Sequence, residues 1–228
     1  MACKCRKSTK LWISSILVII IISALTLFAY TGSQDALRDS VRTGLKNTAG
    51  VMATQVNASD IANLKPGDEM SPKYMAVVNN LWTMRSMNDQ IINAYILKVN
   101  PDHSITFLVD DMYPLDPQGS ARIGEVSTSP DKAEIFAALS TPTASKVPYT
   151  TKYGSFMSAY APIDDSVTGS LGNTTAVLAI DMSAKNYVAA TSTGNAILAT
   201  GLVAIILAVG AIVIFGRKPE EADEPVQK

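Results

Sequence analysis

The chain has 228 residues, a formal net charge of −1 and 47% hydrophobic residues. Residues 31–195 alone carry 12 Lys and Arg against 16 Asp and Glu, a net charge of −4, so we expect no nucleic-acid partner for this part. A segment of this length is sufficient for one folded domain with a buried core.

The only cysteines, Cys3 and Cys5, lie near the start of the chain, so residues 31–195 contain no disulfide. A Cys-x-Cys pair close to a membrane could be acylated or could bind a metal ion. No third or fourth ligand follows at a suitable spacing, which favours free thiols. We therefore expect neither a metal site nor a cofactor.

Two uncharged apolar stretches, residues 11–30 and 196–216, lie on either side of the central segment. Each is long enough for a helix to cross a hydrocarbon core of roughly 30 Å. Basic residues flank both stretches on their outer sides, and such flanks stay in the cytoplasm. The flanking residues are Lys4, Arg6, Lys7, Lys10, Arg217 and Lys218.

These features predict a two-pass protein of the plasma membrane with both termini in the cytoplasm. A leader, residues 1–10, precedes the first span, and a short tail, residues 217–228, follows the second. The domain at residues 31–195 is then outside the cell. A cleaved signal peptide is the alternative for the first stretch, and it gives the domain the same location.

The segment after the first span has the period of a helix. Its apolar residues recur four or seven positions apart and form one stripe, opposite a charged face. The stripe consists of Leu37, Val41, Leu45, Met52 and Val56. It predicts a stalk helix that leaves the span without a break and packs on the domain, on a second copy of the chain, or on both.

A second helix is predicted from Pro72 to about Met87, because Ser71 is a favourable N-cap and proline is favoured at the first helical position. The pattern then becomes extended, with turns at Gly and Pro residues. A short helix begins after Ser129-Pro130 and ends before Pro142. The predicted strands are Ile91–Val99, Ile105–Val109, Lys146–Lys152, Ser155–Ile163 and Thr174–Met182.

This order predicts an α+β domain. Two strands, a crossover and three further strands form a five-stranded antiparallel sheet with helices on one face. The long N-terminal stalk helix and the two transmembrane helices complete the expected architecture.

Five segments carry a resemblance to a known family: Ala94–Val99, Leu108–Asp110, Ile123-Gly124, Tyr153–Ile163 and Ala176–Met182. Together they resemble the Cache family of extracytoplasmic sensor domains, also called PDC or PAS-like sensors. The resemblance implies a PAS-like sheet and a pocket on its helix-covered face, which holds a small polar molecule such as a carboxylate or an amino acid. Only one lobe is present, and the Arg-x-Trp pattern of the two-lobed amino-acid receptors is absent, so ligand identity does not transfer.

Candidate ligand-binding residues come from the strands that carry this resemblance. Asp181 and Asp110 are either pocket acceptors or exposed strand ends, and we expect Asp111 to be solvated. Tyrosines on the strands could surround a pocket or could simply favour extended structure. Arg122 and Lys146 could meet an anion, although solvation is the simpler role. The full candidate set is Tyr95, Asp110, Tyr149, Tyr153, Ser158, Tyr160 and Asp181.

Groups for catalysis are few. His103, the only histidine, lies in a hairpin turn where we expect exposure. The pairs Asp110-Asp111 and Asp164-Asp165 are neighbours in loops and form no obvious dyad. We therefore expect that the protein is not an enzyme.

The leading interpretation is a membrane-anchored extracytoplasmic sensor that binds a small polar molecule and signals through its spans. We expect no output module after the second span. The signal would then pass to a membrane or cytoplasmic partner; the alternatives are a protein that only captures a ligand and a remnant sensor. Small residues along the second span favour a homodimer. These are Gly201, Ala204, Ala208 and Ala211. The alternative is a cell-surface structural or protein-interaction module without a small-molecule ligand.

Overall fold

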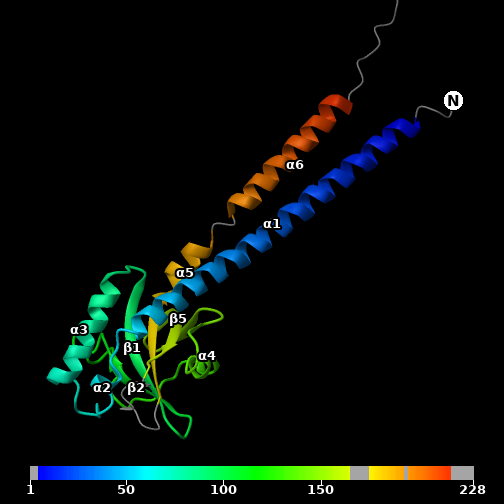
Figure 1. Cartoon of the computed structure of the whole chain (residues 1–228). Coiled ribbons are helices and arrows are strands. Elements are labelled where there is room, and N and C mark those ends of the chain that lie inside the picture. Colours follow the sequence, from blue (N-terminus) through cyan, green and yellow to red (C-terminus); the bar gives the residue numbers. More distant parts are fainter. Residues whose placement is uncertain (1–4, 165–174, 193–194, 217–228) are drawn as a thin grey trace, which may run out of the picture. The chain divides into compact units, whose positions relative to one another are not determined.

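Figure 1 shows the computed structural model, which describes residues 5–164, 175–192 and 195–216. These residues form two compact units. One unit contains the described residues up to Ala36 and from Ser192 onward. The other, from Leu37 to Thr191, is the folded domain.

Two apolar helices make up the first unit. Helix α1 runs from Cys5 to Ala53, so its first part belongs here, and α6 runs from Asn195 to Gly216. Both are long and apolar enough to cross a membrane. Large apolar side chains such as Phe28, 79% exposed, and Leu207, 68% exposed, point outward, as lipid-facing residues do. The predicted spans lie inside these two helices.

Helix α6 closely approaches α1 at one glycine. A Cβ atom at Gly201 would lie 2.3 Å from Cγ2 of Thr26, far inside van der Waals contact. At Gly210, which lies further along the same helix, such an atom would meet nothing within 4 Å. The missing side chain at Gly201 is therefore what permits the contact, as small residues do between membrane helices.

The helices of the domain follow the predicted order, with two additions. The predicted cap of the second helix is confirmed, since Ser71 Oγ accepts a hydrogen bond from the Tyr74 amide at 3.2 Å. The additions are α2 and α5, of which α5 follows the last strand; neither was predicted. The helices are the second part of α1, α2 (Ala58–Ile61), α3 (Pro72–Ser86), α4 (Lys132–Ala137) and α5 (Ala184–Thr191).

All strand pairs are antiparallel, which confirms the predicted α+β class. The strands lie in the order β2-β1-β6-β5-β3, and β4 also pairs with β5. The first and last strands are neighbours at the centre of the sheet, an arrangement that fits a PAS-like fold. The strand bounds are β1 (Ile91–Val99), β2 (Ile105–Asp110), β3 (Thr143–Ala144), β4 (Tyr149–Thr151), β5 (Gly154–Pro162) and β6 (Thr175–Ser183).

One edge of the sheet is divided. The predicted strand at 146–152 is shorter, as β4, and the two-residue β3 precedes it; both pair with β5. Pro148, which has no backbone N–H to give to a ladder, lies between these two short strands. Within the described residues the sheet therefore has six strands, and the edge beside the site described below is a short one.

Each face of the sheet has its own apolar cluster. On one face, residues of α1, α2 and α3 pack against Ala94, Ile96 and Ile180. On the other face, Ile135 of α4 packs with Leu97 and alternating strand residues. Figure 1 shows α3 and α4 at opposite sides of the domain.

The apolar stripe of the stalk is used within the domain. Leu45, Met52 and Val56 are all buried in the first of these clusters, and Val41 packs against it. The stripe thus packs on its own domain, one of the alternatives that the sequence left open.

Candidate functional site

A pocket of about 190 Å³ opens on the sheet face that carries α4. The resemblance implied a pocket on the helix-covered face. The long helices α1 and α3 cover the opposite face, so this expectation is wrong as to the side. The cause is dense packing: side chains such as Met52 and Leu81 fill the face under α1 and α3.

Side chains from five strands and two loops line the pocket. Strands β1 and β6 supply polar and aromatic groups from the centre of the sheet, β2 supplies them from one edge, and β5 and β4 supply them from the other half of the sheet. The lining residues are Asn93, Tyr95, Phe107, Asp110, Met112, Asp116, Gly119, Ser120, Ser127, Thr128, Ser129, Tyr149, Thr151, Tyr153, Phe156 and Asp181.

The structure brings the seven candidate residues together. Five of them line the pocket: Tyr95, Asp110, Tyr149, Tyr153 and Asp181. The other two, Ser158 and Tyr160, are fully buried and do not line it. Both contact Tyr149 by hydrogen bonds, 2.7 Å for Ser158 and 3.1 Å for Tyr160, so they form the layer beneath the lining.

Asp181 lies at the inner end of the pocket and is 3% exposed. Its Oδ1 accepts hydrogen bonds from Ser158 Oγ at 2.5 Å and Tyr95 OH at 3.2 Å. Oδ2 accepts from Asn93 Nδ2 at 3.4 Å. All three donors are neutral. Burial raises the pKa of this carboxyl to about 6, and the three hydrogen bonds oppose that rise.

A chain of hydroxyls joins Asp181 to a second buried acid, Asp131. It runs from Asp181 to Ser158, then to Tyr149, to Tyr160 and to Asp131, whose Oδ2 accepts from Tyr160 OH at 3.0 Å. The chain contains four hydrogen bonds, but its three hydroxyls carry only three protons. All four bonds form at once only when one of the two carboxyls holds a proton. In agreement, burial raises the pKa of Asp131 as well.

Asp110 has a structural task at the pocket wall. Its Oδ1 accepts from the Met112 amide and its Oδ2 from the Ala121 amide, each at 2.9 Å. The carboxylate therefore closes the loop that follows β2. Burial raises its pKa, which the two amide bonds oppose. Asp116 is exposed at the rim, where it accepts from the Gly119 amide at 3.0 Å.

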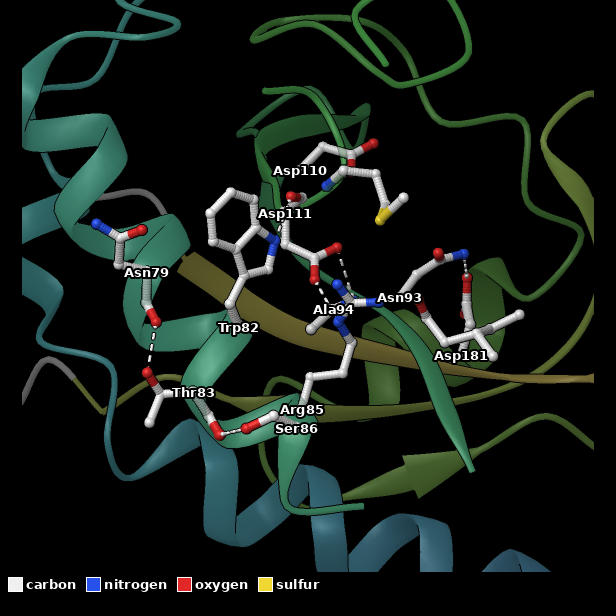
Figure 2. A network of polar contacts seen from close by, with 12 residues as sticks. Asn79, Trp82, Thr83, Arg85, Ser86, Asn93, Ala94, Asp110, Asp111 and Asp181 are labelled. Carbon is white, nitrogen blue, oxygen red and sulfur yellow. Dashed lines mark hydrogen bonds and ion pairs between the residues drawn. The ribbon is translucent and has the colours of Figure 1, made fainter. Parts of the chain in front are cut away.

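Asp111, expected to be solvated, is completely buried. Figure 2 shows it on the α3 side of the sheet, between Trp82, Arg85 and Ala94. Arg85 Nε lies 2.8 Å from Asp111 Oδ2, and the Ala94 amide donates to Oδ1 at 3.1 Å. Consecutive residues at the end of a strand point to opposite faces, so Asp110 reaches the pocket and Asp111 reaches α3. Burial raises the pKa of Asp111 to about 7, more than the nearby Arg85 charge lowers it.

At the outer rim of the pocket, Glu125 contacts both Tyr153 and Lys152. Tyr153 OH donates to Glu125, and Lys152 Nζ lies 2.7 Å from the same carboxylate. Lys152 also lies 4.8 Å above the Tyr153 ring. Arg122 and Lys146, the two bases weighed as anion contacts, do not line the pocket, and Lys146 pairs with Glu134 at 3.5 Å. His103 is exposed in its turn.

Several lining residues escaped the sequence analysis. Asn93 is placed opposite Asp181 by the register of β1 and β6, and sequence alone gives no such register. Phe107 and Phe156 read as ordinary core residues. Asp131 and Ser145, in the layer beneath, were hidden because the partners of their side chains are 13 or more positions away. Among the described residues, no group of three or more His, Cys, Asp or Glu side chains could hold a metal ion.

No protein-family model matches the chain, and no curated protein matches it. Among solved structures, the chain is similar to "the extracellular domain of the putative histidine kinase mmHK1S-Z2", with a TM-score of 0.39 and 13% sequence identity. The similarity covers 72% of this chain and spans 61% of that chain's length. A superposition this loose does not define a shared fold or function.

Proposed function

We propose that this chain is a membrane-anchored sensor whose domain binds a small polar molecule outside the cell. The observation that carries the proposal is the pocket itself: a cavity of about 190 Å³ in which aromatic walls surround a few convergent polar groups, with the buried Asp181 at its inner end. This composition is typical of small-molecule sites. The volume is below the range for drug-sized ligands, which favours a small ligand.

The PAS-like sheet order and the resemblance to Cache sensors support the same interpretation. Two helices long enough to span a membrane, with basic flanks, support an external location for the domain. The domain would signal through its spans to a membrane or cytoplasmic partner, as a homodimer, and would catalyse no reaction. Protease added to intact cells tests the orientation: cleavage should fall in the domain, at exposed sites such as Arg122, and spare the tail.

A thermal-shift screen of the full chain in detergent tests ligand binding. The library contains small carboxylates, amino acids, amines and purines. A ligand at about 100 times its dissociation constant stabilises the folded state by roughly 2.7 kcal/mol, which raises the melting temperature by several degrees. No shift with any class would contradict the sensor proposal and favour the surface-interaction alternative.

The same screen with Asp181→Asn links a hit to the pocket. Asparagine has the size of aspartate, so the fold is retained while the charge is lost. The matched control is Asp89→Asn, which removes one carboxylate from an exposed turn outside the pocket. Binding that weakens in Asp181→Asn and not in Asp89→Asn assigns the hit to this site.

A further inference from the structure

The charged side chains that line the pocket are all acidic. Its lining contains three carboxylates, Asp110, Asp116 and Asp181, and no Lys, Arg or His. Carboxylate ligands, and the carboxylate end of an amino acid, need a positively charged partner or several free donors to replace their hydration. The lining offers them neither a basic side chain nor relief from repulsion by Asp181.

Two basic side chains close to the pocket lining, Arg85 and Lys152, are already paired. Arg85 lies on the other side of the sheet, 2.8 Å from Asp111. Lys152 lies at the rim, 2.7 Å from Glu125. Recruiting either to an anionic ligand would break an existing ion pair, and for Arg85 would leave the buried Asp111 unpaired.

Asp181, unlike these paired bases, has no partner of opposite charge among the described residues. It is 3% exposed, and its three hydrogen bonds come from neutral groups. No ion pair of Asp181 is found in the part of the chain that the structure describes. A buried carboxylate that is hydrogen-bonded but has no counter-charge gains most from a cation placed beside it.

The walls of the pocket suit a cation as well. The rings of Tyr95 and Phe107 lie 5.5 Å apart, and those of Phe107 and Tyr153 lie 5.9 Å apart, so three aromatic rings are contiguous. Aromatic faces attract ammonium groups. The arrangement of Lys152, with its Nζ 4.8 Å above the Tyr153 ring, shows one ammonium already on this aromatic surface.

We propose that the pocket takes a small organic cation, an amine or a quaternary ammonium compound without a carboxylate group. The positive centre lies against Asp181, and the carbon groups lie on the rings of Tyr95, Phe107 and Tyr153. Asn93 and Tyr149 offer hydrogen bonds to a hydroxyl on the ligand. This inference rests on the proposed function and narrows it to one class of ligand.

Three probes of matched shape test the charge requirement with the full chain in detergent. Choline is a permanent cation, 3,3-dimethylbutan-1-ol is its neutral isostere, and glycine betaine adds a carboxylate. Ethanolamine and propylamine extend the series to primary amines, and acetate and alanine represent the excluded classes. We expect at least one of choline, ethanolamine and propylamine to raise the melting temperature by several degrees. The affinity of its neutral or carboxylated analogue should be at least ten times lower.

Two variants then place the cation in the pocket. Asp181→Asn should lower the affinity of the best cation at least tenfold, whereas the control Asp89→Asn should leave it unchanged. Tyr95→Phe keeps the aromatic ring and should retain binding within about threefold. The comparison of choline with its neutral isostere uses the wild-type chain, so it stands even if a variant does not fold.

The outcomes separate this inference from the proposed function. Binding of acetate or alanine in preference to every amine leaves the sensor proposal standing and overturns the cation. Equal binding of choline and its neutral isostere, or full affinity in Asp181→Asn, also overturns it. If no compound of any class binds, both proposals are wrong.

Discussion

Arg42 of helix α1 donates a hydrogen bond from Nε to the backbone carbonyl oxygen of Ser145, at 3.0 Å. Ser145 Oγ in turn accepts from the Ser158 amide at 3.0 Å, and Ser158 Oγ donates to Asp181 at 2.5 Å. A short series of hydrogen bonds therefore connects the inner end of the pocket to the stalk part of α1. It does so through the sheet edge at β5 and not through the apolar core.

Replacing Arg42 should weaken the attachment of this edge to α1. Arg42→Ala removes the bond to Ser145 and a longer one, 3.5 Å, to the Ala144 carbonyl oxygen. Because the guanidinium is partly exposed, we expect a loss of about 1 kcal/mol in unfolding free energy, a few degrees in melting temperature. The control Arg122→Ala removes an exposed arginine outside this contact and should change the melting temperature by less than one degree. Equal effects of the two variants would argue against the contact.

Breaking the Arg85–Asp111 pair should be much more costly. Arg85→Met leaves a carboxylate of zero side-chain exposure without its counter-charge, which typically costs about 3–5 kcal/mol. In the double variant with Asp111→Asn, the buried charge is gone and a large part of the stability should return. Lys146→Met is the control, because that lysine is 78% exposed and its pair is worth well under 1 kcal/mol. Chemical denaturation of the wild type, Arg85→Met, Asp111→Asn and the double variant measures the coupling, and additive losses would contradict it.

Stability should rise as the pH is lowered from 8 towards 5. The pKa values of Asp181, about 6, and Asp111, about 7, lie above the ordinary value of 3.8, so the folded state binds protons that the unfolded state has released. The unfolding free energy therefore falls as pH rises from about 4 to about 7. Burial raises the pKa of Asp110 and Asp131 in the same direction.

A melting-temperature series from pH 5 to pH 8 checks this sign. In Asp181→Asn the part of the slope below pH 6 should become smaller, because one of the titrating groups is gone. The lowered pKa values of two more exposed acids, Asp102 and Glu125, act in the opposite sense at lower pH. A maximum of stability at pH 8 would contradict the prediction.

The affinity for choline should fall as the pH is lowered, whereas the stability of the free protein should rise. Choline keeps its charge at every pH, so the protein alone determines the profile. Below the pKa of Asp181, about 6, the ligand has to displace a proton, and the association constant should fall tenfold for each further pH unit. Titration calorimetry at pH 7.5, 6 and 5 measures this. A flat profile would exclude a charged contact with Asp181.

The contact between Gly201 and Thr26 predicts a positional effect in the membrane unit. Gly201→Val places atoms inside the space of the Thr26 side chain and should push the two helices apart. Gly210→Val makes the same change where nothing lies within 4 Å and should have no effect. Spin labels at the exposed positions Leu25 and Leu202 report the separation. An unchanged distance in Gly201→Val would show that this contact does not hold the helices.

Local patterns predicted much of this fold. The bounds of β1 agree with the prediction because β-branched and aromatic residues fill Ile91–Val99, and α3 begins at Pro72 because its cap is encoded in Ser71. Helix α5 was missed because its small residues around Tyr187 continue directly from β6, although Ser183 is a start signal: its Oγ accepts a hydrogen bond from the Asn186 amide at 3.1 Å. The predicted strand at 146–152 was too long because Pro148 interrupts the pairing.

Less of the candidate site than of the fold could be predicted from the sequence. The family resemblance, together with strand alternation and residue type, indicated five lining residues, including Asp181. What they could not give is the register that sets Asn93 beside Asp181, or the fact that Asp110 and Asp111 serve different faces. Those relations depend on how strands far apart in sequence align. The face of the pocket was wrong for a related reason, since only packing decides which side of a sheet is filled.

The paired roles of Asp110 and Asp111 limit how this domain can be redesigned. Asp110 fastens the loop after β2 on one side, and on the other Tyr74, Trp82 and Arg85 hold the same two residues. A substitution at Asp110 would remove its hydrogen bonds to the loop after β2 and would change the ligand preference at the same time. Tyr153, in the turn between β4 and β5, and Thr151, on the short edge strand, are half-buried and outside this junction. Libraries for altered specificity should therefore begin at those two positions and leave the acidic pair intact.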